Sequence, residues 1–206
     1  MTADALVGIV DDDAGARRSL GWLIQSAGFE VRLWESPEAF LVEPNWDDLG
    51  CLILDWRLPS MTGMDLYEQI MARGIRLPTI FVTGHGEVKN CSRAFRAGAI
   101  DFLEKPVADD ILIARIQIAL SRTIQARRAS EVNRRRETLT MREQEVLDLL
   151  VAGRRLKEVA STLAISLQTA AKHRSRILIK MRAENDVELA HLVTSTKSPS
   201  EISAHP

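Results

Sequence analysis

Residues 6–13 read Leu-Val-Gly-Ile-Val-Asp-Asp-Asp, a short apolar run that ends in three carboxylates. Runs of this length and composition are typical of buried strands in a parallel sheet. A further strand is expected near 29–34, and three more end in a polar residue: Cys51–Leu54 before Asp55, Thr79–Val82 before Thr83, and Asp101–Glu104 before Lys105. Because ligands of an open parallel sheet bind beyond the carboxyl ends of its strands, we expect these polar groups to meet at one edge.

Helical patterns alternate with these runs and set the fold class. The expected helices are Ala14–Ala27, a short one beginning at Ser36-Pro37, Met64–Arg73, Glu87–Ala97 and Ile111–Ile124. Ser36 has the residue type of a helix cap, and glycines follow three of the other helices as stop signals. Alternating strands and helices predict an α/β fold in which helices cover both faces of a parallel sheet.

The C-terminal part has a helical pattern throughout. Expected helices are Thr140–Val151, Lys157–Leu163, Leu167–Arg182 and Asp186–Val193. Thr140 with Glu143 three residues later forms a capping box, and the tight turn Ala164-Ile165-Ser166 fits a helix-turn-helix. We expect a first domain at 1–121, a helical basic linker at 122–136, a four-helix all-α domain at 137–195 and a flexible tail at 196–206. Met141 and Met181 are expected in the second core.

The charge distribution separates the two halves. Residues 1–120 carry 18 acidic against 11 basic side chains, and residues 121–206 carry 10 against 16, so the basic half is a candidate for binding nucleic acid. No apolar stretch approaches the ~20 residues of a membrane span, and no secretory signal is visible. Cys51 and Cys91 lack metal-ligand spacing and are expected to be free thiols in a reducing compartment, which favours the cytoplasm.

The polar groups at the strand ends suit phosphoryl transfer. An aspartate carboxylate can attack a phosphoryl donor and form an acyl phosphate. Carboxylates at Asp11, Asp12 and Asp55 suit Mg²⁺, which prefers a few carboxylates together with water and phosphate oxygens. Lys105 and Thr83 offer an amine and a hydroxyl for phosphoryl oxygens.

At these positions the chain resembles the receiver domain of bacterial two-component response regulators. The resemblance covers about 120 residues and adds three motifs to the acidic cluster and Asp55: Pro59-x-Met61-x-Gly63, Thr83-Gly84 and Lys105-Pro106. It implies a flavodoxin-like sheet of five strands in the order 2-1-3-4-5, with a cis Lys105–Pro106 bond.

The resemblance also implies the roles of individual residues. Asp55 would be the phosphoacceptor, with Thr83 and Lys105 beside it. Asp11, Asp12, Asp55 and the backbone carbonyl of Arg57 would hold Mg²⁺, while Asp13 would be a bystander. Thr83 and Phe102 would form the switch pair that reports phosphorylation to the output face.

Leu167–Arg182 is the candidate helix for the major groove of DNA, which admits one α-helix. Ala170, Ile177 and Met181 recur near helical spacing and are expected to face the core. Lys172, Arg176 and Lys180 recur every four residues as a basic stripe, with Gln168, Ala171 and Ser175 beside it. Arg154, Arg155 and Lys157, before and at the start of the preceding helix, could grip the DNA backbone.

The segments Leu139-Thr140-x-Arg142-Glu143, Lys157-Glu158-Val159-Ala160 and Leu163-Ala164-Ile165-Ser166 resemble the LuxR-type helix-turn-helix. Joined to the receiver, they resemble the NarL/FixJ class of response regulators, and the Thr-Gly-His-Gly segment from Thr83 favours the FixJ-like branch. We expect the DNA contacts to come from the following residues: Lys157, Gln168, Thr169, Lys172, His173, Arg174, Ser175, Arg176 and Lys180. Lys172 is expected to read sequence and Arg174 to bind phosphate.

The sequence therefore predicts a DNA-binding transcriptional response regulator that is not an enzyme, apart from its own phosphorylation and autophosphatase chemistry. A sensor histidine kinase, promoter DNA and a second copy of the chain after phosphorylation are the expected partners, with no membrane. One alternative is a phosphohydrolase of the haloacid-dehalogenase class with the Asp11-x-Asp13 spacing, although Gly15 departs from that pattern. Another is a receiver that acts only as an interaction module.

Overall fold

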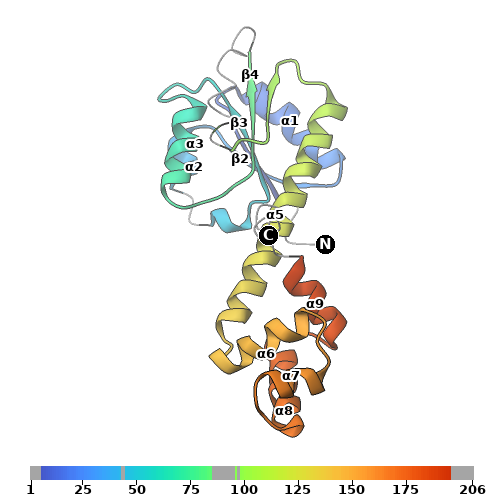
Figure 1. Ribbon diagram of the computed structural model, residues 1–206. Coiled ribbons are helices and arrows are strands. Elements are labelled where there is room, and N and C mark those ends of the chain that lie inside the picture. Colours follow the sequence, from blue (N-terminus) through green and yellow to red (C-terminus); the bar gives the residue numbers. More distant parts are fainter. Residues whose placement is uncertain (1–5, 43–44, 85–95, 97, 196–206) are drawn as a thin grey trace. The chain divides into compact units, whose positions relative to one another are not determined.

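The computed structural model describes residues 6–42, 45–84, 96 and 98–195 (Figure 1). The chain divides into two compact units, the first ending at Gln125 and the second beginning at Ala126. The expected helix Glu87–Ala97 and Cys91 fall largely or wholly outside the described residues. Among the described residues, no helix combines the length and the apolar character that crossing a membrane requires.

The first unit is built on a parallel sheet, as predicted. Its strands are β1 (Leu6–Val10), β2 (Glu30–Trp34), β3 (Cys51–Asp55), β4 (Thr79–Thr83) and β5 (Asp101–Glu104). They pair in the order β2-β1-β3-β4-β5, which confirms the expected topology. Since β1 lies next to β3, their carboxyl ends bring Asp11 and Asp55 to the same edge.

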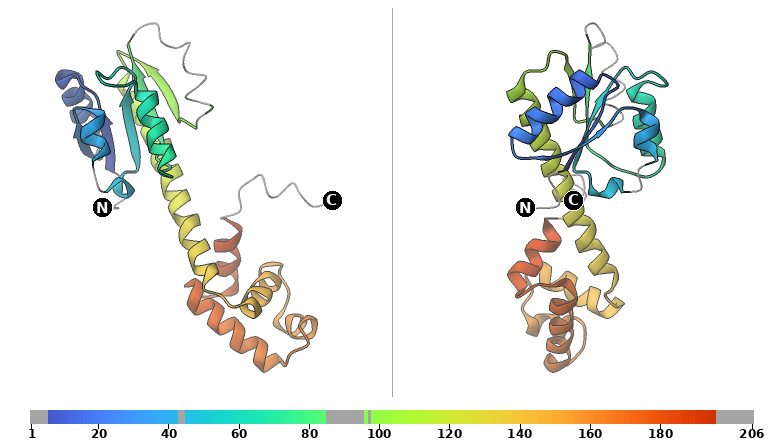
Figure 2. Two further views of the ribbon diagram at one scale, coloured as in Figure 1. Left: turned by 90° about the vertical axis from the view of Figure 1, so that its left-hand side faces the viewer. Right: turned by 180° about the vertical axis from the view of Figure 1, so that it is seen from behind.

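Helices cover both faces of this sheet (Figures 1 and 2). The helix α1 (Ala14–Ser26) and the first part of α5 (Asp109–Glu137) lie on one face, whereas α2 (Pro37–Leu41) and α3 (Gly63–Ala72) lie on the other. A short 3₁₀ helix, η1, covers Trp46–Asp48. Alternate side chains of the central strand β3 enter opposite cores, so Ile53 packs with α1 and α5 while Leu54 packs with α2 and α3. Cys51 is buried with a free thiol.

Helix α5 runs without a break from the first unit into the second. The expected basic linker at 122–136 is helical, because nothing between Asp109 and Glu137 is a glycine or proline. Thr123 is buried in the first unit and its hydroxyl donates to the Gly50 carbonyl at 2.5 Å. Val132 instead belongs to the core of the second unit. The last turns of α5 are therefore part of the second unit's packing.

The second unit adds α6 (Met141–Val151), α7 (Leu156–Thr162), α8 (Leu167–Met181) and α9 (Asp186–Thr194). The predicted capping box of Thr140 and Glu143 is present, and the Ser166 hydroxyl caps α8. Met181 is buried as expected, but the placement of Met141 in the core was wrong, since its side chain is 81% exposed. The buried face of α6 runs through Glu143, Val146, Leu147 and Leu150, and Met141 lies off it.

Candidate functional site

Three carboxylates meet at the carboxyl edge of the sheet. One oxygen each of Asp11, Asp12 and Asp55 lies within 4.8 Å of the others. Asp11 and Asp55 are buried, Asp55 being 7% exposed, whereas Asp12 is exposed. The cluster therefore has a buried floor and an open side.

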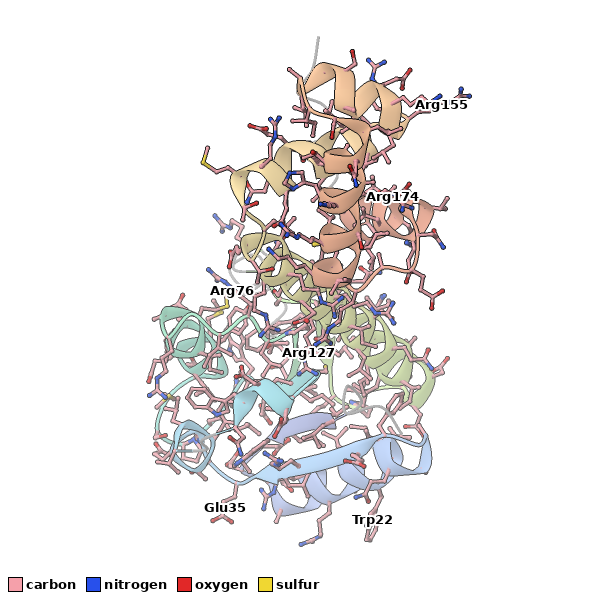
Figure 3. The ribbon with its side chains drawn as sticks, turned by 90° about the horizontal axis from the view of Figure 1, so that it is seen from below. Trp22, Glu35, Arg76, Arg127, Arg155 and Arg174 are labelled. Atoms are coloured by element: carbon pink, nitrogen blue, oxygen red, sulfur yellow. The ribbon has the colours of Figure 1, made fainter. Side chains whose placement is uncertain are left out.

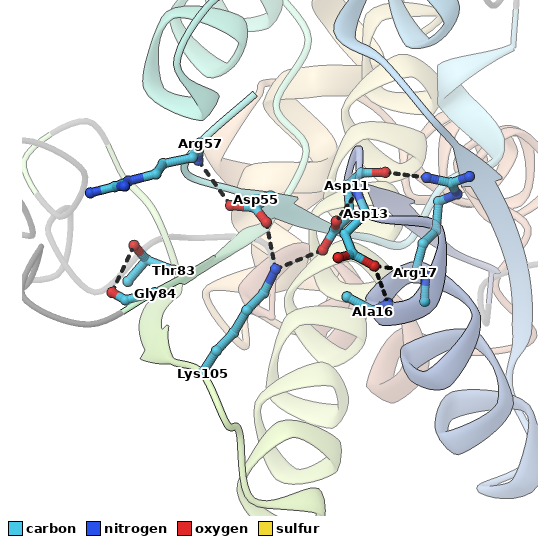
Figure 4. Close-up of polar contacts among 10 residues, drawn as sticks. Asp11, Asp13, Ala16, Arg17, Asp55, Arg57, Thr83, Gly84 and Lys105 are labelled. Carbon is cyan, nitrogen blue, oxygen red and sulfur yellow. Dashed lines mark hydrogen bonds and ion pairs between the residues drawn. The ribbon is translucent and has the colours of Figure 1, made fainter. Parts of the chain in front are cut away.

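Lys105, which directly follows β5, contacts two of these carboxylates. Its Nζ donates to Asp11 Oδ2 at 2.8 Å and to Asp55 Oδ2 at 2.5 Å (Figure 4). The other oxygen of Asp55, Oδ1, accepts the Arg57 backbone N–H at 2.9 Å. The Lys105–Pro106 bond is cis, as the resemblance implied.

The electrostatics of the pocket follow from this arrangement. Burial raises the pKa of Asp55 above its ordinary value, against hydrogen bonds from Lys105 and the Arg57 N–H that lower it. Burial alone would lower the pKa of Lys105, but hydrogen bonds to Asp11 and Asp55 raise it above the ordinary value. Three carboxylates against one amine leave an excess of negative charge. Hard oxygen donors with such an excess are compatible with Mg²⁺.

Asp13 has a different task from its two acidic neighbours. It is the N-cap of α1, where its Oδ1 accepts the N–H groups of Gly15 at 2.7 Å and Ala16 at 2.8 Å. Those backbone hydrogen bonds hold the pKa of Asp13 below its ordinary value. Of the three consecutive acidic residues, Asp13 therefore stabilises the N-terminus of α1.

Gly63 brings the start of α3 against the backbone of Asp55. Its N–H donates to the Trp56 carbonyl at 2.8 Å, and a Cβ built on it would overlap the Asp55 carbonyl oxygen. Steric hindrance by the Asp55 backbone therefore explains why the last position of the Pro59-x-Met-x-Gly63 motif is a glycine.

Thr83 and Phe102 lie on the neighbouring strands. Thr83 is buried at the end of β4, and its hydroxyl donates to the Gly84 carbonyl at 3.3 Å (Figure 4). Phe102 is half-buried in β5, with its ring 5.3 Å from that of Trp56, the residue after Asp55. The aromatic contact connects Phe102 with Trp56, the residue that directly follows Asp55 and the end of β3.

In the second unit, α8 presents an exposed polar face. Gln168, Lys172, Ser175 and Arg176 are exposed, as is Ala171. Ile179, which the sequence reasoning did not include, is 74% exposed. Ala170, Ile177 and Met181 are fully buried, as their spacing predicted. Lys157 is exposed at the start of α7. Arg155, the N-cap residue of α7, points outward (Figure 3).

The other predicted DNA contacts on α8 are half-buried. The Nε of Arg174 donates to both oxygens of Asp186 at 2.7 and 3.0 Å, and the Nζ of Lys180 lies 2.6 Å from Glu143 Oε2. The hydroxyls of Thr169 and Ser166 are 2.8 Å apart. His173 Nδ1 is buried without a hydrogen-bond partner within the described residues. Sequence reasoning treated Glu143 only as a cap and did not weigh Asp186, although opposite charges at these positions were visible.

Comparisons with known proteins agree with this geometry. Residues 7–117 match the family of response regulator receiver domains, and residues 137–193 match the luxR family of bacterial regulatory proteins. The transcriptional regulatory protein FixJ of Rhizobium meliloti is 38% identical over 194 residues, which are 92% of this chain and 94% of FixJ. The C4-dicarboxylate transport transcriptional regulatory protein DctR of Rhodobacter capsulatus is 40% identical over 192 residues, covering 90% of this chain and 98% of DctR. Among solved structures, the response regulator StyR superposes with a TM-score of 0.68 at 37% identity, covering 92% of this chain and 98% of StyR.

The chain belongs to the response regulators, in the class that joins a receiver domain to a LuxR-type DNA-binding domain. Within that class it is a two-component transcription regulator of the NarL/FixJ type. The predicted resemblance and the predicted general function are therefore confirmed.

Proposed function

We propose that Asp55 accepts a phosphoryl group from a sensor histidine kinase and that this modification controls binding of α8 to promoter DNA. The observation that carries the proposal is the contact of one amine, Lys105 Nζ, with the two buried carboxylates Asp11 and Asp55. A buried acceptor beside a fixed cation, with the exposed Asp12 available as a further metal ligand, suits attack on a phosphoryl donor.

The chemical step balances within this pocket. A carboxylate oxygen of Asp55 forms a bond to phosphorus while the bond between phosphorus and the imidazole nitrogen of the kinase breaks, and that nitrogen keeps the electron pair. Lys105 is positioned to stabilise the negative charge of the phosphoryl oxygens. Because the Asp55 side chain is buried, water contributes little to stabilising the charge on its nucleophilic oxygen.

Asp11, Asp12 and Asp55 would hold Mg²⁺, with the Arg57 carbonyl as a further ligand. When bound, the ion supplies positive charge that offsets the repulsion between the carboxylates and the incoming phosphoryl group. Asp12, exposed on the open side, would join the two buried carboxylates in holding the ion.

The phosphoryl group would then shift the receiver between two conformations that differ at Thr83 and Phe102. Its oxygens offer new acceptors for Lys105 and for the Thr83 hydroxyl, which now donates to the Gly84 carbonyl. A turn of Thr83 toward Asp55 would open space that Phe102 can enter. Two phosphorylated receivers would pair in the cytoplasm, placing two α8 helices on DNA half-sites about one turn apart.

Labelling by acetyl phosphate with Mg²⁺ tests the acceptor, with wild type compared with Asp55→Ala and Asp11→Asn by intact and peptide mass spectrometry. We expect one phosphoryl group on Asp55 of the wild type and none on Asp55→Ala. Labelling of Asp55→Ala would contradict the proposal, and an adduct on Asp11 would favour the phosphohydrolase alternative. Decay of the label after the donor is removed measures autophosphatase activity.

DNA binding before and after this treatment tests the coupling. We expect phosphorylation to tighten binding of the wild type and to leave Asp55→Ala unchanged. Equal binding by the treated and untreated wild type would instead support a receiver that acts only as an interaction module.

A further inference from the structure

The basic stripe of α8 divides into two kinds of residue. Each step of four residues along an α-helix advances by about 40°, so Lys180 is rotated by about 80° from Lys172. Lys172 and Arg176 stay on the exposed face, and no hydrogen bond or ion pair engages their side chains in the part of the chain that the structure describes. The Lys180 side chain, 34% exposed, lies against α6 instead.

Lys180 ties the end of α8 to the start of α6. Its Nζ donates to Glu143 Oε2 at 2.6 Å and to the Thr138 carbonyl at 3.0 Å. The same oxygen of Glu143 accepts the Thr140 N–H at 2.9 Å, which closes the capping box. In the last turn of α5, Arg135 Nη1 donates to the Met181 carbonyl at 3.1 Å. Two cations therefore fix the last turn of α8 to the corner between α5 and α6.

Glu143 depends on this partner. Its side chain is only 3% exposed. Loss of the cation that pairs with a buried carboxylate strongly destabilises the folded state. The hydrogen bond from Lys180 holds the pKa of Glu143 below its ordinary value, so the carboxylate stays ionised. Because Glu143 already neutralises the charge of Lys180, a phosphate near Lys180 would release few additional counterions.

We infer that Glu143 and Lys180 are positioning residues, which hold the orientation of α8 on α6, while Lys172 and Arg176 contact the DNA. The inference rests on the proposed DNA binding. It removes Lys180 from the residues expected to bind DNA and gives Glu143 an effect on DNA recognition.

The test measures binding of the full chain, treated with acetyl phosphate and Mg²⁺, to two duplexes. One is selected from a random-sequence library by the wild type, and the other is a scrambled duplex of the same composition. Lys180→Gln and Glu143→Gln are compared with Arg176→Gln, a matched control on the exposed face of the same helix. Each affinity is measured over a series of salt concentrations, at a temperature where circular dichroism shows the variant to be folded.

The two interpretations predict changes of opposite sign in the DNA affinity of Glu143→Gln. If the pair positions α8, this variant weakens binding to the selected duplex by about tenfold, with a smaller loss on the scrambled duplex. If Lys180 contacts phosphate, removal of the neighbouring negative charge strengthens binding to both duplexes instead. Lys180→Gln should also lose specificity with an unchanged salt slope, whereas Arg176→Gln should reduce the slope by about 0.9 on both duplexes.

Tighter binding by Glu143→Gln, or a slope for Lys180→Gln that falls as far as that of Arg176→Gln, would overturn the inference. Should either single variant not fold, the double variant Glu143→Met with Lys180→Met replaces the pair by apolar side chains of similar volume. Its salt slope should equal that of the wild type, and a drop of about 0.9 would contradict the positioning role. A wild type that selects no duplex would overturn the proposed function as well, an outcome distinct from any difference between variants.

Discussion

Both units of this protein place a lysine amine against a buried carboxylate, yet the two clusters have different consequences. In the first unit Lys105 faces Asp11 and Asp55, at 2.8 and 2.5 Å, with Asp12 close by. In the second unit Lys180 faces one carboxylate, that of Glu143, at 2.6 Å, and also donates to the Thr138 carbonyl at 3.0 Å. The distances are alike, and the difference lies in the balance of charge and of hydrogen-bond donors.

The pKa directions express that difference. Burial raises the pKa of Asp55, whose neighbours include a second buried carboxylate. The hydrogen bond from Lys180 lowers the pKa of Glu143, which also accepts the Thr140 N–H of its capping box. A carboxylate with too few cations can accept a cation or a phosphoryl group, whereas a satisfied carboxylate stabilises the packing of helices.

The largest expected effect concerns the backbone that supports the first cluster. Gly63→Ala would drive a Cβ into the Asp55 carbonyl oxygen, so we expect it to destabilise the first unit by about 3 kcal/mol. All four tryptophans precede residue 60, so denaturation followed by tryptophan fluorescence reports on the first unit. Gly84→Ala is the control, because a Cβ there meets no atom of the described residues within 4 Å. Equal stability of the two variants would show that α3 can move away from Asp55.

Replacement of the buried carboxylate by its isosteric amide should change the stability of the two units in opposite directions. Glu143→Gln loses a charged hydrogen bond to Lys180 and should destabilise the second unit by about 2 kcal/mol. Asp55→Asn removes one charge from the acidic cluster and should stabilise the first unit by about 1 kcal/mol, a rise of a few degrees in Tm. Fluorescence follows the first unit, and circular dichroism follows both. A loss of stability in both variants would remove the contrast between the clusters.

Magnesium binding should distinguish adjacent acidic residues. Asp12→Asn removes one charged oxygen ligand and should weaken Mg²⁺ binding by about tenfold, as loss of a metal-site interaction typically does. Asp13→Asn should leave binding nearly unchanged, because asparagine caps a helix as well as aspartate does. Trp56, beside Asp55, offers a fluorescence signal for the titration. Equal losses from the two variants would mean that Asp13 also serves the metal.

The pH dependence should sharpen the contrast further. Because the folded-state pKa of Glu143 lies below its ordinary value of 4.5, the stability it contributes is present above that value. It is lost as pH falls through the lowered folded-state pKa. The difference in unfolding free energy between wild type and Glu143→Gln should therefore narrow below pH 4.5, as measured by urea denaturation at several pH values. A gap that stays constant down to the lowest accessible pH would contradict the lowered pKa.

Much of the local structure followed from patterns within a few residues. The apolar runs predicted all five strands, and the capping signals at Ser36 and Thr140 predicted helix starts that the structure confirms. The predicted burial of Met141 was wrong because its apolar character gave no information about which face of α6 it occupies. The expected helical basic linker at 122–136 continues α5, because arginine is a good helix former and no glycine or proline interrupts the segment.

The sequence by itself determined the strand–helix alternation, the parallel sheet and the chemical types that its carboxyl edge would collect, since each depends on periodicity and on residues at strand ends. Only the tertiary structure decided which charges face which. It directed the Asp13 carboxylate to the first N–H groups of α1, and it turned Lys180 toward Glu143 while Lys172 stayed exposed. The reason is physical: charge pairing depends on distances of a few ångströms between elements far apart in the chain, which packing sets and local sequence does not record.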